Sequence, residues 1–178
     1  MAIRLTKARL LVSLGGILAV TACDALEEDP AATPAPHETR EAGVERVVDG
    51  DTIIVDLAGE RRRVRLLNID APEATDPDRP AECLGPEATA FVEGLLPPGT
   101  EVHLVYDIEV ADQYGRDLAG VFRDELFVNA EIARHGLAEA VYFPPNDRFL
   151  DDVEAAVAEA RAARRGLFDP SIPCTTAR

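Results

Sequence analysis

Hydrophobic and polar residues alternate in short segments along this chain, and the pattern predicts five β-strands and three helices. Strands are indicated where apolar or β-branched residues occupy every second position between turn residues. The predicted strands span residues 44–48, 52–57, 61–69, 100–107 and 116–123. Helices are indicated where apolar residues recur every three or four positions and so form one apolar face. The predicted helices span residues 85–96, 129–135 and 149–165.

Turn and capping residues set the limits of these elements. Asp49-Gly50 predicts a turn between the first two strands, and Gly59 lies in a tight turn before the third. Asn129 is expected to cap the second helix, and Gly136 is expected to end it. Five short strands with three helices suit a small closed barrel. The predicted fold is therefore mainly β with α, a five-stranded OB-fold barrel with three packed helices.

The beginning of the chain predicts export and a membrane tether. Residues 1–22 have a basic start, an apolar segment and small residues before Cys23, as in a bacterial lipoprotein signal peptide. An ordinary cleaved signal with a coincidental cysteine is the alternative. Residues 23–43 are acidic and proline-rich, which predicts a disordered linker. We expect a domain over residues 44–169, a tail over 170–178, and a lipid-anchored protein that faces the periplasm or the cell exterior.

The strongly acidic composition limits the ways in which this chain could bind nucleic acid. The formal charge of the 178 residues is −15, and cleavage of the predicted leader would take it to −18. Proteins that coat nucleic acid normally show an excess of lysine and arginine. A nucleic-acid site in this chain must therefore be local, and most of the negative charge is expected to form a solvated surface.

Two acidic clusters at the borders of predicted strands form a candidate metal site. Asp51 and Asp70 would converge on one cation if their strands pair as a hairpin. A hard ion such as calcium prefers several oxygen ligands, and the carbonyl of Ala71 could supply another. The alternative is that these aspartates only form turns, which they do more often than they bind metals. Asp49 is expected to be a turn former rather than an outer partner of the metal.

Other charged residues near these clusters could act on a phosphodiester. Glu73 could accept a proton from water, and Arg65 and Arg116 could stabilise negative charge on a phosphate. Arg65 could equally belong to a solvated basic segment with residues 61–63. The spacing suggests metal-assisted phosphodiester chemistry but leaves both readings open.

Seven short motifs occur in a fixed order between residues 44 and 168. They are Val48-Asp49-Gly50-Asp51-Thr52, Arg65-Leu66-Leu67, Asp70-Ala71-Pro72-Glu73, Gly85-Pro86-Glu87-Ala88, Tyr114-Gly115-Arg116, Val128-Asn129 and Gly136-Leu137-Ala138. Each motif alone is weak, but together in this order and at these intervals they are highly specific. The segment resembles the staphylococcal nuclease, or thermonuclease, family.

This resemblance implies an OB-fold enzyme that cleaves DNA and RNA with calcium. The implied calcium ligands are the carboxylates of Asp51 and Asp70 and the carbonyl of Ala71. The implied catalytic residues are Glu73, which would activate or orient the attacking water, and Arg65 and Arg116, which would bind the scissile phosphate. The expected products carry 3′-phosphate and 5′-hydroxyl ends. Single-stranded or unpaired substrates are favoured. A monomer is expected as the default for a domain of this size.

The resemblance also implies residues that bind the substrate outside the catalytic centre. Tyr114 and Tyr142 would border the nucleotide. The loop over residues 75–82 carries a single cation, Arg79, and Gln113 stands where the family can have a lysine. Fewer phosphate contacts would weaken substrate affinity and its dependence on salt.

The remaining two cysteines predict a disulfide. With Cys23 assigned to lipid, Cys83 and Cys174 form an even pair in an exported chain. The bond would link the long loop to the C-terminal tail, and two free thiols are the alternative.

We therefore predict a membrane-tethered, calcium-dependent nuclease outside the cytoplasm. One alternative is a lipoprotein whose OB-fold binds nucleic acid or protein without catalysis. The other is a structural lipoprotein that calcium stabilises.

Overall fold

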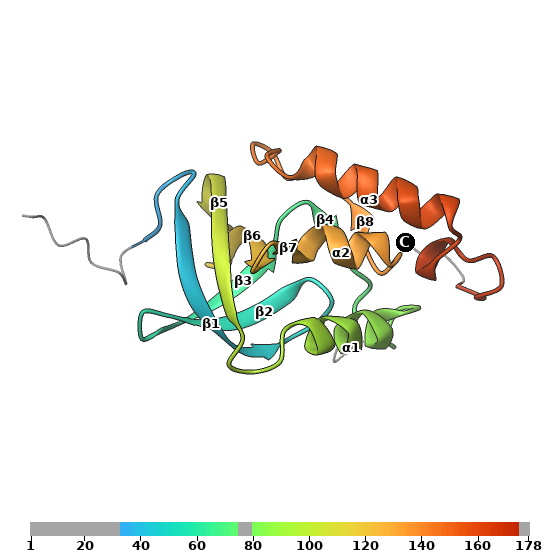
Figure 1. Cartoon of the computed structure of the whole chain (residues 1–178), viewed down its shortest axis with the longest axis horizontal. Coiled ribbons are helices and arrows are strands. Elements are labelled where there is room, and N and C mark those ends of the chain that lie inside the picture. The colour runs from blue at the N-terminus through green and yellow to red at the C-terminus, as the bar shows by residue number, and fades with distance from the viewer. Residues whose placement is uncertain (1–32, 75–79, 175–178) are drawn as a thin grey trace, which may run out of the picture.

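The computed structural model describes residues 33–74 and 80–174 (Figure 1). The predicted leader, the lipidation site at Cys23 and the predicted substrate-binding residue Arg79 all lie outside these residues. Within the described part of the chain, no helix is both long enough and apolar enough to cross a membrane.

Five strands form a closed barrel, as the hydrophobic pattern predicts. The barrel strands are β1 (Thr39–Val47), β2 (Thr52–Leu57), β3 (Glu60–Leu66), β5 (Glu101–Ala111) and β6 (Asp117–Arg123). Neighbours in the order β3-β2-β1-β5-β6 pair antiparallel, and a parallel pairing of β3 with β6 closes the barrel. Strand β7 (Leu126–Phe127) extends this sheet beyond β6, and β4 (Ile69–Asp70) pairs separately with β8 (Glu139–Ala140). The predicted fold class is confirmed.

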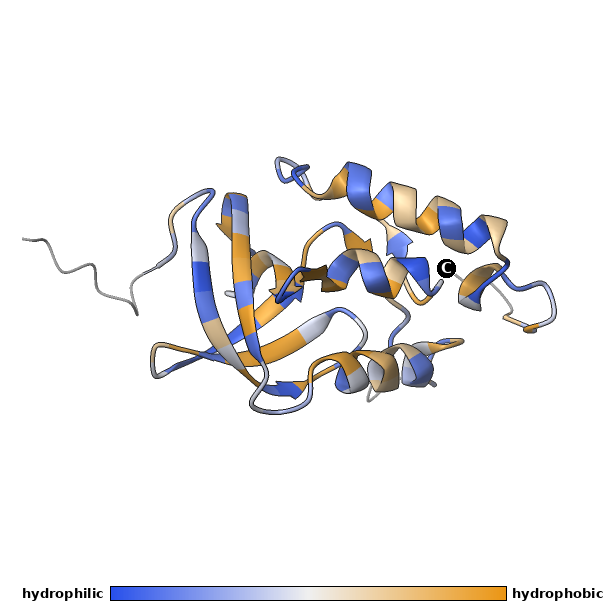
Figure 2. Cartoon of the chain, viewed as in Figure 1, coloured by the Kyte–Doolittle hydropathy of each residue, from blue (hydrophilic) through white to orange (hydrophobic). Residues whose placement is uncertain are grey.

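Three α-helices gather at one end of the barrel (Figure 1). They are α1 (Gly85–Leu95), α2 (Val128–Arg134) and α3 (Leu150–Ala162), and a short 3-10 helix, η1 (Gly166–Phe168), follows. The core beneath them is built from strand residues that point inward, and Ile53, Val64 and Leu104 are fully buried. Figure 2 shows the apolar and polar residues alternating along β5, where every second side chain from Val102 to Tyr106 is buried.

The role predicted for Asn129 is wrong. The residue at the N-cap of α2 is Phe127, and Asn129 lies inside the helix, fully buried. The Asn129 side chain accepts a hydrogen bond from the backbone N–H of Val121 and donates one to the carbonyl of Leu67. Asn129 therefore joins α2 to β6 and to the segment after β3. Its capping preference is overridden because these buried backbone groups need partners.

Several strand boundaries also differ from the prediction, and β5 continues to Ala111 instead of ending at residue 107. Strand β1 begins at Thr39, so residues 39–43, which we expected to belong to a disordered linker, pair with β5 from Val105 back to Glu101. Their polar composition hides this strand, whose backbone hydrogen bonds depend on β5. Strand β3 ends at Leu66 rather than at residue 69, because Asn68 has a φ of 61° and turns the chain.

The predicted disulfide is present between Cys83 and Cys174. Their Cα atoms are 5.4 Å apart, although 91 positions separate them in sequence. The bond joins the segment that precedes α1 to the segment that follows η1.

Candidate active site

A tight turn between β1 and β2 presents Asp51 to the site. The Asp49 carboxylate accepts a hydrogen bond of 3.1 Å from the backbone N–H of Asp51, which is the turn-forming role expected of it. At Gly50, an added Cβ would lie 2.7 Å from the Cβ of Ala71 and 2.8 Å from that of Ala88. Glycine therefore lets the turn pack directly against the segment after β4 and against α1.

Asp51 is a buried carboxylate, and its hydrogen bonds and the nearby Arg65 cation offset its loss of hydration only in part. Its Oδ2 accepts a hydrogen bond of 2.9 Å from the backbone N–H of Ala71, and its Oδ1 accepts one from the Thr52 hydroxyl. Burial raises the pKa of Asp51 to about 7, although the nearby Arg65 cation lowers it. A second positive charge at this position would therefore favour the ionised carboxylate.

Arg65 gathers the two predicted metal ligands around one nitrogen atom. Its Nη2 lies 3.1 Å from an oxygen of Asp51 and 3.3 Å from an oxygen of Asp70. Its Nη1 donates to the carbonyls of Leu66 and Ile69, at 2.9 and 2.8 Å. The residue is 7% exposed, so the alternative of a solvated surface arginine is wrong.

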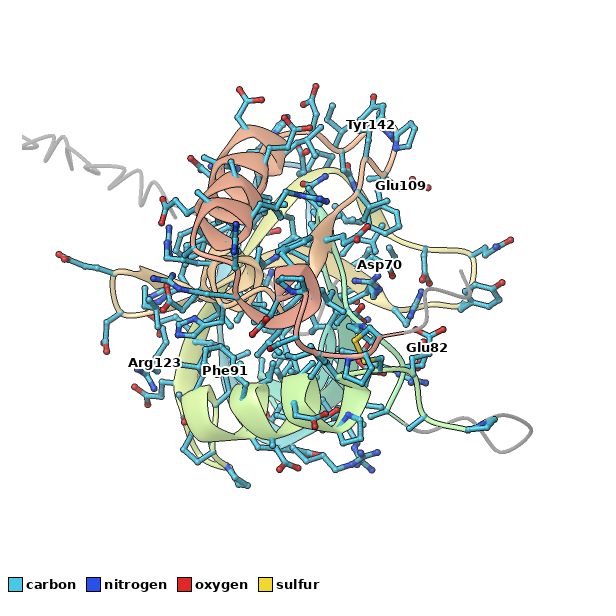
Figure 3. The ribbon with its side chains drawn as sticks, turned by 90° about the vertical axis from the view of Figure 1, so that its right-hand side faces the viewer. Asp70, Glu82, Phe91, Glu109, Arg123 and Tyr142 are labelled. Carbon is cyan, nitrogen blue, oxygen red and sulfur yellow. A yellow bond between two sulfur atoms is a disulfide. The ribbon has the colours of Figure 1, made fainter. Side chains whose placement is uncertain are left out.

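The donor atoms at this site suit a hard cation. The carboxylates of Asp51 and Asp70 approach the same nitrogen of Arg65, and the Asp70 side chain is 48% exposed, on the face seen in Figure 3. Among the described residues, no group of three or more histidine, cysteine, aspartate or glutamate side chains is placed to hold a metal. The ligands would therefore be two carboxylates, the backbone carbonyl of Ala71 and water. Calcium accepts such a set of oxygen ligands.

Glu73 lies at the exposed edge of this carboxylate group. Its backbone N–H donates to Oε2 of Glu82, and the N–H of Glu82 donates to the carbonyl of Glu73. Gly85 lies so close that a side chain there would overlap this carbonyl, and α1 therefore supports the segment. Partial loss of hydration raises the pKa of Glu73, and the charges of Asp49, Glu82 and Asp70 raise it further. The raised pKa makes Glu73 a stronger base than an ordinary glutamate.

Arg116 lies in the loop between β5 and β6, next to a pocket. Its Nε donates a hydrogen bond of 2.7 Å to Asp112, which also accepts from the backbone N–H groups of Arg116 and Tyr114. The guanidinium carbon lies 5.7 Å from the centre of the Tyr114 ring. Arg63, Tyr114, Gly115 and Arg116 line a pocket of about 290 Å³. Asp112 and Arg63 are parts of the site that we did not predict.

The predicted tyrosines both expose their rings. Tyr114 is 76% exposed and Tyr142 is 51% exposed. Tyr142 follows β8, which pairs with β4 so that Asp70 lies opposite Glu139. Figure 3 labels Tyr142 and Asp70 on the same side of the molecule. The structure thus brings Asp51, Arg65, Asp70 and Ala71 into direct contact, whereas the two tyrosines lie outside this group.

Comparison with known proteins identifies relatives with a matching domain. A family model described as staphylococcal nuclease homologue matches residues 63–169, which include Arg65, Asp70, Glu73 and Arg116 but not Asp51. The chain is 40% identical to a thermonuclease of Staphylococcus intermedius over 126 residues, which are 71% of this chain and 74% of the relative. It is 36% identical to a thermonuclease of Staphylococcus hyicus over 123 residues, 69% of this chain and 72% of the relative. It is 31% identical to endonuclease YncB of Bacillus subtilis over 130 residues, 72% of this chain and 61% of the relative.

Proposed function

The chain belongs to the staphylococcal nuclease family, and we propose that it is a calcium-dependent nuclease that hydrolyses the phosphodiester bonds of DNA and RNA. The observation that carries the proposal is the meeting of Asp51 and Asp70 at one nitrogen of Arg65, with Ala71 in contact. Relatives called thermonuclease and endonuclease support the reaction type.

Calcium fits the oxygen-rich end of this site. Asp51 and Asp70 would hold it through their carboxylates, and Ala71 would hold it through its carbonyl. When bound, the ion supplies positive charge that neutralises phosphate oxygens and lowers the pKa of nearby water. The buried Asp51 favours such an ion because its desolvated carboxylate has only Arg65 as a cationic partner within hydrogen-bonding distance among the described residues.

Glu73 is the proposed general base. Its carboxylate takes a proton from water as the water oxygen forms a bond to phosphorus. The bond between phosphorus and the 5′-oxygen breaks, and that oxygen takes a proton from solvent water to give a 5′-hydroxyl, while the phosphate stays on the 3′ side. A raised pKa makes Glu73 a stronger base than an ordinary glutamate.

Arg65 and Arg116 are proposed to stabilise the charge that develops on the phosphate. Arg65 already contacts two carboxylates, so a phosphate must compete for it. The contact with Asp70 is the longer of the two, at 3.3 Å, and Asp70 is half-exposed. A phosphate could therefore displace Asp70 while Asp51 stays in place. Arg116 keeps its Nε on Asp112, which leaves its terminal nitrogens for a phosphate.

Cleavage assays on the leaderless domain test this proposal. Single-stranded DNA and RNA would be incubated with calcium or with a chelator, beside Glu73→Gln, Arg65→Ala and the control Glu93→Gln on the exposed face of α1. We expect calcium-dependent cleavage by the unmodified domain and by the control, and strong loss in the other two. No calcium-dependent cleavage by the unmodified domain would refute the nuclease proposal. Binding without cleavage would favour a non-catalytic OB-fold module, and calcium binding without either would favour a structural lipoprotein.

We also propose that the protein is exported and anchored through lipid on Cys23, facing the periplasm or the cell exterior. The disulfide between Cys83 and Cys174 supports an oxidising compartment. Metabolic labelling with a fatty acid would test the anchor in the full chain. We expect label on the unmodified protein and none on Cys23→Ala, whereas equal labelling of the two would refute this assignment.

A further inference from the structure

Three consecutive arginines on β3 differ in how their charges are compensated. Arg61 lies 2.8 Å from a carboxylate oxygen of Glu45, and Arg62 lies 3.8 Å from one of Asp117. Arg63 is exposed, and among the described residues no carboxylate forms an ion pair with it. Of these three arginines, therefore, only Arg63 has no carboxylate partner in the described part of the chain.

The closure of the barrel places this charge beside Arg116. In the parallel pairing of β3 with β6, Val64 lies opposite Asp117. The residues that precede this pair are Arg63 and Arg116, so these two arginines are neighbours across the two strands. Both residues line the pocket of about 290 Å³ together with Tyr114. Because Asp112 already compensates Arg116 at 2.7 Å, Arg63 supplies the free positive charge of the pocket.

We propose that Arg63 binds a non-scissile phosphate of the substrate strand, next to the phosphate that is cleaved. This inference rests on the proposed function. Arg63 and Arg65 are two residues apart on β3, so they lie on one face of the strand about 7 Å from each other. Arg65 is buried under the two aspartates, whereas Arg63 lies at the exposed pocket. A phosphate at Arg63 would thus be a neighbour of the phosphate at Arg65.

The charge of the whole protein makes such a contact important. The chain carries a formal charge of −15, so long-range attraction to nucleic acid cannot supply the affinity. A phosphate contact positions the strand without reading its sequence. Arg63 should therefore contribute equally to different sequences, and its contribution should fall as salt rises.

Binding of a short single-stranded oligodeoxynucleotide, followed by fluorescence anisotropy in chelator, tests the proposal without cleavage. Arg63→Gln should raise Kd about five- to twentyfold at low salt and lower the slope of log Kd against log salt by about 0.7. Arg63→Lys should retain most of the affinity. The matched control is Arg61→Gln, which removes the same charge from the same face of β3 at a residue already paired with Glu45. We expect it to change Kd less than twofold.

Two outcomes would overturn the role of Arg63. If Arg63→Gln binds as tightly as the unmodified domain, no phosphate contacts this residue. If Arg61→Gln weakens binding as much as Arg63→Gln, the effect reflects net charge rather than a contact. Equal urea midpoints for the variants would exclude unfolding as the cause.

The same measurements separate this inference from the proposed function. If the domain cleaves DNA and Arg63→Gln binds normally, only the Arg63 inference fails. If the domain binds the oligonucleotide through Arg63 but cleaves nothing, only the nuclease proposal fails. Absence of oligonucleotide binding at low salt, together with absence of cleavage in calcium, would overturn both.

Discussion

Arg65 holds its Nη2 atom 3.1 Å from Oδ2 of Asp51, and both side chains are almost fully buried. This ion pair contributes to the stability of the fold as well as to the proposed chemistry. Arg65 also satisfies the carbonyls of Leu66 and Ile69, where the chain turns away from β3. The structure therefore couples the stability of the domain to the residues of its site.

Replacing Arg65 should destabilise the domain as well as impair catalysis. Arg65→Gln would leave Asp51 buried without its cation and two carbonyls without a donor, which predicts a loss of about 3 kcal/mol in the free energy of unfolding. Adding Asp51→Asn to this variant should recover part of the loss, because the unpaired charge is removed. Urea unfolding in chelator would measure both, with Arg61→Gln as a control expected to change stability by less than about 0.5 kcal/mol. An unchanged urea midpoint for Arg65→Gln would contradict the coupling.

The stability of the metal-free domain should depend on pH through Asp51. Its pKa in the folded protein, about 7, lies above the ordinary value of 3.8, so folding favours the protonated form. The stabilising contribution of this group is complete below about pH 4 and is lost as pH rises through about 7. Calcium requires the ionised carboxylate, so it should restore stability most strongly at pH 8.

Urea midpoints at pH 5.5 and pH 8, with calcium or chelator, would check this expectation. Asp51→Asn should remove this part of the pH dependence and most of the response to calcium. A midpoint that calcium leaves unchanged at pH 8 would contradict the assignment of Asp51 as a ligand.

The activity of the enzyme should depend on pH through Glu73. Partial loss of hydration and the charges of Asp49 and Glu82 raise its pKa, so the ionised base forms at higher pH than for an ordinary glutamate. The rising limb of kcat/KM against pH should lie correspondingly high. Glu82→Gln keeps an oxygen that can accept the N–H of Glu73 but removes a negative charge, so the limb should move to lower pH.

Glu73→Gln provides the complementary measurement. It should lower kcat by about 10²- to 10⁴-fold, the range for loss of a general base, with little change in stability because the side chain is exposed. Glu93→Gln should change neither kcat nor the pH position of the rising limb of kcat/KM. If the rising limb of kcat/KM lies at the same pH in Glu82→Gln as in the unmodified enzyme, another group controls the pH profile.

Removal of the disulfide should affect both stability and catalysis. Cys83→Ser with Cys174→Ser opens a link across 91 positions, which predicts a loss of about 4 kcal/mol in the loop-entropy model. Cys83 follows Glu82, and Glu82 is hydrogen-bonded to Glu73, so a looser segment should also lower kcat/KM. Urea unfolding and cleavage rates of oxidised and reduced protein would test this. Full activity in the reduced, folded protein would show that the bond does not position Glu73.

Local patterns in the sequence were sufficient for most of the fold. Alternation of apolar residues located the barrel strands, and proline and glycine marked the ends of α1 and α2, because these signals act over a few neighbouring residues. The start of β1 at Thr39 does not follow from local pattern, because its first residues are polar and are held by pairing with β5. The capping preference of Asn129 does not predict its position, because its side chain instead bonds two distant backbone groups.

The sequence by itself determined which residue types meet at the site: carboxylates at the borders of two strands, and arginines near them. Only the tertiary structure decided how these charges are shared. It buried Arg65 between Asp51 and Asp70, and the closure of β3 against β6 left the charge of Arg63 beside Arg116. The reason is physical: spacing along a strand fixes the face on which a side chain lies, but its ionic partners come from strands that pair across the barrel.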